Sequence, residues 1–163
     1  MDAVIRAREK LHPDCFACSA NHPAGPGLQC EGRSDGTVVG RVVLDGRFQG
    51  YPGIAQGGVV ATLLDSAMAQ CLMALGIAAV TADLRVRFRS PVELGVPTEV
   101  QARVMEAAPP LFRLQADVRQ GLRVVATGRG VFVDRREEDA GVLDTEPGVG
   151  ENAGDSDPDS PGA

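Results

Sequence analysis

The stretch that decides the fold is GIAQGGVVATLLDSAM, residues 53–68. From Val59 onward its apolar residues recur every three or four positions as far as Leu75. This spacing predicts one helix over about 57–75. Gly76 follows as a residue that readily takes the left-handed conformation with which many helices end. The helix is apolar over most of its surface, so a sheet has to cover it.

Short apolar runs separated by turn residues predict the strands of that sheet. Two runs precede the helix, at 28–31 and 37–44, and four follow it, at about 79–89, 98–106, 111–119 and 123–133. The connections are short, so consecutive strands are expected to pair antiparallel. The predicted class is α+β, with an antiparallel sheet wrapped around one long central helix.

The chain is expected to form one domain with additions at both ends, because 163 residues suit a single core. Residues 28–136 make the predicted domain. Before it, 1–27 are expected to hold a short helix and an irregular loop rich in Pro, Gly, Cys and His. After it, 137–163 combine Gly, Pro, Ser and acidic residues with few apolar groups, which predicts a disordered acidic tail.

The formal net charge of −6 comes from that tail. Residues 1–136 hold all 16 basic residues and 13 of the 22 acidic ones, so the predicted domain is mildly basic. A mildly basic domain suits an anionic small ligand. Its charge is too weak to indicate nucleic-acid binding.

No membrane span or signal peptide is expected. The first ten residues are charged, and the long apolar stretch 54–80 carries Asp65 near its centre. An Asp at the centre of a spanning helix costs about 2.5–3.5 kcal/mol on insertion scales. We therefore expect a cytoplasmic protein whose four cysteines are reduced.

Gly57-Gly58 opens the predicted helix, and a backbone without side chains lets a ligand come close. The first N–H groups of a helix lack partners within it, and the helix dipole adds about half a positive charge there. A carbonyl oxygen gaining negative charge suits such a position. The alternative is an ordinary helix start whose glycines serve packing.

Asp65 is the only acid between Ile54 and Val80, and Asp is a poor residue for the middle of a helix. It is a candidate general base or nucleophile. The alternative is a solvent-exposed stripe made of Thr62, Asp65 or Ser66, and Gln70. Eight residues separate Gly57 from Asp65, about 12 Å along the helix axis. Reacting groups must lie about 3 Å from a substrate carbon, so the two residues serve different sites or one site shared between subunits.

The segment TADLRVRFRS, residues 81–90, alternates in the manner of a half-buried strand. Thr81 falls on the same face as Arg85, Arg87 and Arg89 unless a bulge intervenes. Those arginines are candidate ligands for phosphate groups. The alternative is an ordinary solvent-facing surface of an amphipathic strand.

The N-terminal loop carries His12, Cys15, Cys18 and His22 in the spacing H-x2-C-x2-C-x3-H. Such residues can hold zinc, although here all four would come from one short loop. A Cys15–Cys18 redox pair is the second alternative, and no thioredoxin-like βαβ pattern surrounds it. The favoured interpretation is a structured loop with two packed thiols and no metal. Because no His lies beyond residue 22, a Ser-His-Asp triad is not expected.

The segment GYPGIAQGGVVATLLDSAM (50–68), followed by TADLRVRFRSPVELG (81–95), resembles the hotdog-fold thioesterases. Within this family the chain most resembles the PaaI-like acyl-CoA thioesterases. The resemblance extends from about Cys15 to Val133, and it begins with a CFAC motif followed by Leu28. In that family His-Gly-Gly opens the central helix and a carboxylate follows seven residues after the second Gly. Gly57-Gly58 and Asp65 match that spacing.

The resemblance implies a hydrolase that cleaves an acyl-CoA thioester to a free acid and coenzyme A. The amide of Gly57 would polarise the thioester carbonyl, and Asp65 of the opposing subunit would activate water or attack directly. Thr81 matches a hydroxyl that positions the water. Gln56, in the position of the family His, would be a further catalytic residue, and Gly58 and Gly50 would contact the substrate. The candidate phosphate ligands on the following strand remain Arg85, Arg87 and Arg89. The implied assembly is a homodimer or a dimer of dimers, with no cofactor other than the coenzyme A of the substrate.

Two positions depart from the family pattern. Gln56 replaces the family His, and a glutamine donates a hydrogen bond but does not titrate near neutral pH. Gly50 stands where some members carry Asn. These departures favour the alternative, a non-catalytic protein that binds or senses acyl-CoA. Hydratase or dehydratase chemistry is a third interpretation, and it suffers from the lack of a His near the acid.

Overall fold

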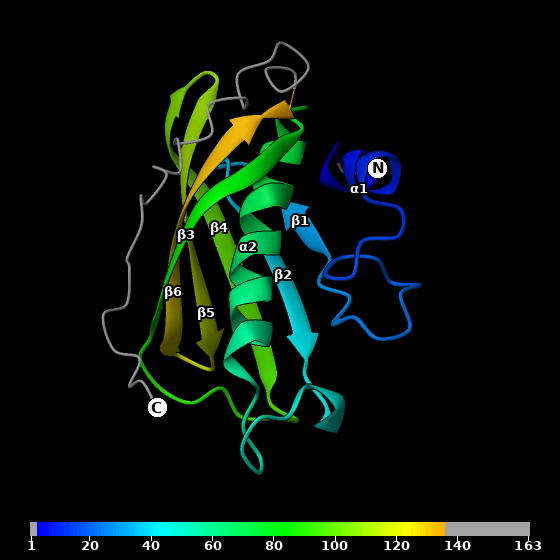
Figure 1. Cartoon of the computed structure of the whole chain (residues 1–163), viewed down its shortest axis with the longest axis vertical. Coiled ribbons are helices and arrows are strands. Elements are labelled where there is room, and N and C mark those ends of the chain that lie inside the picture. The colour runs from blue at the N-terminus through cyan, green and yellow to red at the C-terminus, as the bar shows by residue number, and fades with distance from the viewer. Residues whose placement is uncertain (1–2, 136–163) are drawn as a thin grey trace, which may run out of the picture.

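The computed structural model describes residues 3–135, and the predicted acidic tail lies outside this range. The chain forms a sheet of six strands, one long helix and two short helical segments (Figure 1). In chain order these are α1 (Ala3–Leu11), β1 (Cys30–Gly32), β2 (Val38–Val43), η1 (Gly46–Phe48), α2 (Gly57–Ala74), β3 (Ala79–Phe88), β4 (Pro97–Ala108), β5 (Leu111–Gln120) and β6 (Arg123–Asp134).

The sheet has the order β1-β2-β4-β5-β6-β3, and every pairing in it is antiparallel. Its strands lie along α2, while α1 and the loop that follows it lie beside β1 and β2 (Figure 1). This arrangement confirms the predicted α+β class with an antiparallel sheet around one long helix. β1 and β3 form the two edges of the sheet.

Both ends of α2 follow from local sequence. Gln56 is the residue before the helix, with extended backbone angles, and its side-chain oxygen accepts a hydrogen bond from the N–H of Val59. At the other end Gly76 has a φ of 75°. The N–H groups of Gly76 and Ile77 donate to the carbonyls of Met73 and Leu72, which is the Schellman arrangement. The predicted end at Gly76 is confirmed.

The core lies between α2 and the sheet. The helix buries 10 of its 18 residues, among them Leu63, Leu64, Met68 and Leu72. Two glycines of β6 bring the strand close to the helix. A Cβ on Gly130 would lie 2.6 Å from Phe132 and 3.3 Å from Met68, and one on Gly128 would lie 3.3 Å from Leu64. Close packing of this kind leaves no room for added atoms.

Among the described residues, α2 alone is long and apolar enough to cross a membrane by length and composition. Its buried side chains instead contact the sheet, and 56% of its residues are buried. α2 is therefore the central helix of the core.

The polar side chains of α2 do not form one solvent-exposed stripe, which corrects that alternative. Ser66 is only 6% exposed and Gln70 is completely buried. The side chain of Gln70 donates to Ser66 and to the carbonyl of Leu28, and it accepts from the N–H of Cys30. Arg8 of α1 also donates to Gln70, at 3.2 Å. Gln70 thus joins α1 and β1 to the central helix.

Candidate functional site

The start of α2 is held by the loop that precedes it. The N–H of Gln56 donates to Phe48 O at 2.8 Å, and the N–H of Gly50 donates to Ile54 O at 2.9 Å. A Cβ on Gly50 would lie 3.1 Å from the Cα of Gln56, so a side chain there would push the loop away from the helix. Gly50 therefore lets the loop pack closely on the residue that begins α2.

The amide groups at the start of α2 are available to a ligand. Within residues 3–135 we find no hydrogen-bond acceptor for the N–H of Gly57 or of Gly58. Gly57 lines an open hollow of about 340 Å³ together with Gly50, Tyr51, Ala55 and Gln56. The positive end of the helix dipole adds to the attraction for an oxygen that carries negative charge.

Gln56 has a structural task in addition to the one that the sequence assigned to it. Its Oε1 accepts from Val59 N at 3.1 Å, so the side chain is turned toward the first turn of the helix. A Cβ on Gly58 would lie 2.8 Å from this Oε1, so Gly58 leaves room for the cap. The Nε2 group has no acceptor among the described residues and remains a donor for a ligand.

Asp65 meets Thr81 on the neighbouring strand. The Thr81 hydroxyl donates to Asp65 Oδ1 at 2.7 Å. A register shift between Thr81 and Asp83 marks a bulge, and Thr81 pairs with the buried Phe132 on the helix side of the sheet. Without the bulge Thr81 would share a face with the arginines. The structure therefore brings together the two polar residues to which the resemblance gives one task.

The three candidate phosphate ligands lie elsewhere in the same chain. Leu84 and Val86 pack against the core. Arg85 and Arg87 alternate with them along β3 and therefore project from the other face of the sheet. Arg85 lies 3.4 Å from the carboxylate of Asp83 and is 85% exposed. Arg89 follows the end of β3 and is exposed. Within one chain, these arginines do not join Asp65, and their binding role stays a prediction.

Gly57 and Asp65 lie on the same helix, as predicted, and about 12 Å apart along its axis. Phe88 lies near the first of these residues: a Cβ on Gly57 would be 3.5 Å from its ring. Thr81 lies near the second. One end of β3 therefore lies near Gly57 and the other end lies near Asp65, the two halves of the candidate site. One chain holds both halves but does not bring them together.

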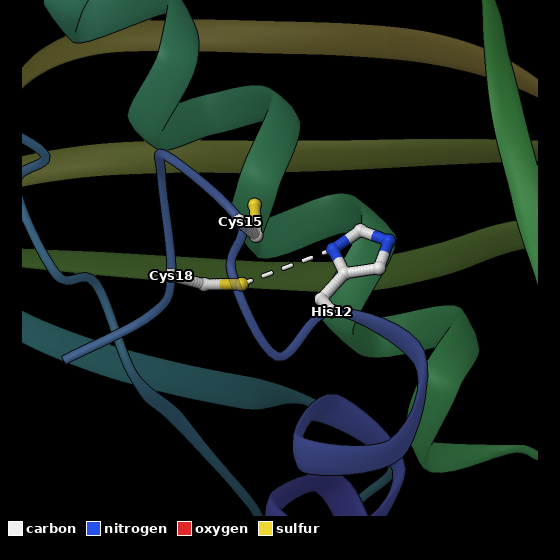
Figure 2. Close-up of side chains that lie close together, drawn as sticks. All are labelled: His12, Cys15 and Cys18. Carbon is white, nitrogen blue, oxygen red and sulfur yellow. Dashed lines mark hydrogen bonds between the residues drawn. The ribbon is translucent and has the colours of Figure 1, made fainter. Parts of the chain in front are cut away.

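The N-terminal loop reaches the neighbourhood of Asp65. Burial lowers the pKa of His12 below its ordinary value, the positive charge of Arg135 lowers it further, and the carboxylate of Asp65 opposes them. His12 also lies with Cys15 and Cys18, and their ligand atoms are within 4.8 Å of one another (Figure 2). His22 is outside this group, because its ring packs edge-on against Phe16 at 5.4 Å.

Sequence reasoning missed two neighbours of the site. Alternation in 81–90 places Phe88 only on the apolar face of a strand, and the spacing around His12 indicates only a loop that could hold metal. The alternating pattern in 81–90 predicts which face of the strand Phe88 lies on. It does not predict which part of α2 Phe88 contacts. The approach of His12 to Asp65 depends on how the loop crosses α2, for which a single sequence gives no signal.

Known proteins with this architecture support one family. The model of the thioesterase superfamily matches residues 52–127, from the loop before α2 into β6. The structure of RHA08564, described as a thioesterase superfamily protein, is 34% identical with a TM-score of 0.64. It is matched over 68% of this chain, which spans 55% of that protein. No curated protein sequence matches the chain.

Two further solved structures share the fold at lower identity. The PaaI protein of E. coli, from the phenylacetic acid degradation operon, is 18% identical with a TM-score of 0.68 over 81% of this chain and 93% of its own. The smu.793 protein of Streptococcus mutans, solved bound to acetyl CoA, is 19% identical with a TM-score of 0.61 over 66% of this chain and 87% of its own. Together with the sheet around α2, these findings show the hotdog fold of these thioesterase-superfamily neighbours, and residues 52–127 match the model of that superfamily.

Proposed function

We propose that this protein hydrolyses an acyl-CoA thioester to the free acid and coenzyme A, in a site shared between two subunits. The observation that carries the proposal is that α2 holds two features: amide groups at its start without a hydrogen-bond acceptor, and Asp65, which accepts a hydrogen bond from Thr81. The first is a site for a developing oxyanion. The second is a carboxylate whose direction is fixed by a donor.

The sharing would require two copies to pair through β3. β3 is an edge strand, so one side of it has backbone groups available to another chain. If two copies pair antiparallel through β3, the Phe88 end of one lies beside the Thr81 end of the other. Phe88 lies near Gly57, and Thr81 donates to Asp65. This pairing would therefore bring the start of α2 in one subunit toward the Asp65 carboxylate of the other.

In the proposed reaction the thioester carbonyl oxygen accepts a hydrogen bond from the N–H of Gly57 and, beside it, from Nε2 of Gln56. Asp65 either takes a proton from the attacking water or attacks the carbonyl carbon itself, in which case water then cleaves the anhydride. The Thr81 hydroxyl holds one oxygen of Asp65 and leaves the other for this task. The carbon–sulfur bond breaks, and the thiol of coenzyme A leaves with a proton.

Two observations support coenzyme A as the thiol part of the substrate. The smu.793 protein of the same fold is described as bound to acetyl CoA. The part of the chain before the acidic tail carries an excess of basic residues, which suits the phosphates of that molecule. The proposed location is the cytoplasm, where acyl-CoA thioesters are available.

The test is thiol release from a panel of acyl-CoA thioesters, measured side by side on the natural protein and on Asp65→Asn. Loss of a positioned acid or base costs about 100-fold to 10,000-fold. We expect turnover by the natural protein and a loss of at least about 100-fold in the variant. Equal activity of the two proteins would exclude Asp65 from the chemistry.

A non-catalytic acyl-CoA-binding protein is the second candidate function. It is favoured by Gln56, whose Oε1 caps α2 and whose side chain does not titrate near neutral pH. For this function, acyl-CoA binds to the natural protein and to Asp65→Asn alike, and neither releases thiol. Binding without turnover therefore selects this second function over the first.

A further inference from the structure

The strongest unassigned cluster lies on the loop between α1 and β1. His12, Cys15 and Cys18 gather there in front of α2, and Figure 2 shows their side chains close together. The Nδ1 atom of His12 is 3.8 Å from the sulfur of Cys18, and all three ligand atoms lie within 4.8 Å of one another. The proposed thioesterase reaction uses none of them directly.

The distances suit a tetrahedral metal ion. With zinc–sulfur bonds of about 2.3 Å and a zinc–nitrogen bond of about 2.0 Å, tetrahedral ligands lie about 3.5–3.8 Å apart. The nitrogen–sulfur distance of 3.8 Å between His12 and Cys18 is a few tenths of an ångström longer than the lower end of this range, which applies to a nitrogen–sulfur pair, and the other two pairs lie within 4.8 Å. Small side-chain rotations therefore suffice to bring the three atoms onto one ion.

The local backbone already forms the turns that such a site needs. The N–H of Cys15 donates to the carbonyl of His12, and the N–H of Ser19 donates to that of Cys15. Cys18 is completely buried, so its sulfur faces the interior side of the loop. The N–H of Leu28 donates to Ala17 O at 2.8 Å and ties this loop to the chain entering β1.

We propose that His12, Cys15 and Cys18 bind one zinc ion through Nδ1 and two thiolate sulfurs. Each thiol loses its proton to solvent when it binds, and no electron is transferred. Two thiolates neutralise the charge of the ion, and the neutral imidazole supplies the third ligand. Thiolate and imidazole are the ligands that zinc prefers, whereas calcium and magnesium require oxygen.

The fourth position belongs to a water molecule. A hollow of about 330 Å³ opens beside the cluster and is lined in part by His12, Cys18 and Glu9. His22 ends the sequence spacing but is not a ligand, because its Nδ1 accepts from the N–H of Ala24 and its ring packs on Phe16. This corrects the four-ligand grouping and leaves three protein ligands.

The consequence of binding is to fix the loop against α2. His12 lies within electrostatic range of Asp65, so the loop forms part of the surroundings of that carboxylate. A metal ion that holds His12, Cys15 and Cys18 together would hold this loop in place. The proposed task of the ion is thus to maintain structure, and the site exists whether or not the chain hydrolyses thioesters.

The test is metal binding by the full chain, purified with reductant and freed of metal by a chelator. After the chelator is removed, zinc is titrated in and the bound metal is measured by elemental analysis. We expect one zinc per chain, and with cobalt(II) in its place the absorption bands of thiolate-to-cobalt charge transfer. Cys15→Ser and His12→Asn should each weaken binding at least about 10-fold.

The matched controls are His22→Asn and Cys71→Ala, which lie outside the cluster and should keep one zinc per chain. Circular dichroism of each chelated variant shows that it is folded before metal is added. Cys15→Ser is preferred to a change of the buried Cys18, because Cys15 is only partly buried.

Three results would overturn the proposal: folded, reduced protein that binds no zinc, zinc bound equally well by Cys15→Ser, or cobalt bound without thiolate bands. Each readout is independent of thioester hydrolysis. The proposed zinc site and the proposed enzyme can therefore fail separately.

Discussion

Asp65 gains its partner through a single irregularity in β3. The bulge between Thr81 and Asp83 turns the Thr81 hydroxyl to the helix side of the sheet, where it donates to Asp65. Asp65 and Gly57 could be picked out from the sequence, because a lone acid and a Gly-Gly pair stand out in an apolar helix. The bulge could not, since the alternation of 81–90 continues through it without a break.

The hydrogen bond to Asp65 can be removed at nearly constant volume. Thr81→Val deletes the hydroxyl and keeps the branched shape of the side chain. A hydrogen bond to a charged group contributes about 1.5–3 kcal/mol, so we expect kcat to fall about 10-fold to 100-fold. The measurement is steady-state thiol release.

Thr81→Ser is the matched control, because it keeps the hydroxyl and should retain most of the activity. If Thr81→Val were as active as the natural protein, Thr81 would have no part in the reaction.

The elements themselves were largely predictable. The helix predicted over about 57–75 is Gly57–Ala74, and the four strands after it lie within about two residues of their predicted ends. Periodicity and turn residues carry this information. The burial of Ser66 and Gln70 was not predictable, because a polar residue on α2 is equally compatible with solvent and with the buried hydrogen bonds that join α1 and β1 to it.

The N–H at the start of α2 can be tested without breaking the helix. Gly57→Pro removes that N–H, and proline is well accepted at the first position of a helix. Gln56 has a φ of −63° and a ψ of 135°, which are angles that a residue before proline prefers. We expect kcat to fall about 100-fold, as for removal of an oxyanion-hole donor.

Gly57→Ala keeps the N–H, and its Cβ would meet Phe88 at an ordinary contact distance of 3.5 Å. It should therefore retain activity. Equal losses in Gly57→Pro and Gly57→Ala would show that the side chain, and not the missing N–H, is the cause.

A small substitution can probe how closely Gly130 of β6 is packed by Phe132 of the same strand and by Met68 of α2. Gly130→Ala would place a Cβ 2.6 Å from Phe132 and 3.3 Å from Met68, so the neighbours must shift. Overpacking of this kind costs about 1–3 kcal/mol in the free energy of unfolding. Chemical denaturation measures it.

The control is Gly46→Ala, whose Cβ would meet nothing within 4 Å. It should leave the free energy of unfolding nearly unchanged. A Gly130→Ala protein as stable as this control would mean that Phe132 and Met68 do not pack against Gly130 as described.

At the scale of the whole molecule, one chain is an incomplete enzyme in the proposed account. The helix start and Asp65 lie about 12 Å apart on α2, too far for one thioester carbon to meet both. The fold could be recognised from the sequence, because the family motif and the strand pattern agree. How two copies meet at β3 could not, since edge strands are not marked in a single sequence.

The most direct test of the shared site joins two inactive proteins. Asp65→Asn and Gly57→Pro are co-expressed with different tags, and the mixed dimer is isolated through both tags. One site of this dimer carries both substitutions and the other carries neither. The account predicts that the mixed dimer recovers about half of the natural thiol-release activity per dimer, far above either parent. Activity no higher than that of the parents would contradict a site built from Gly57 of one subunit and Asp65 of the other.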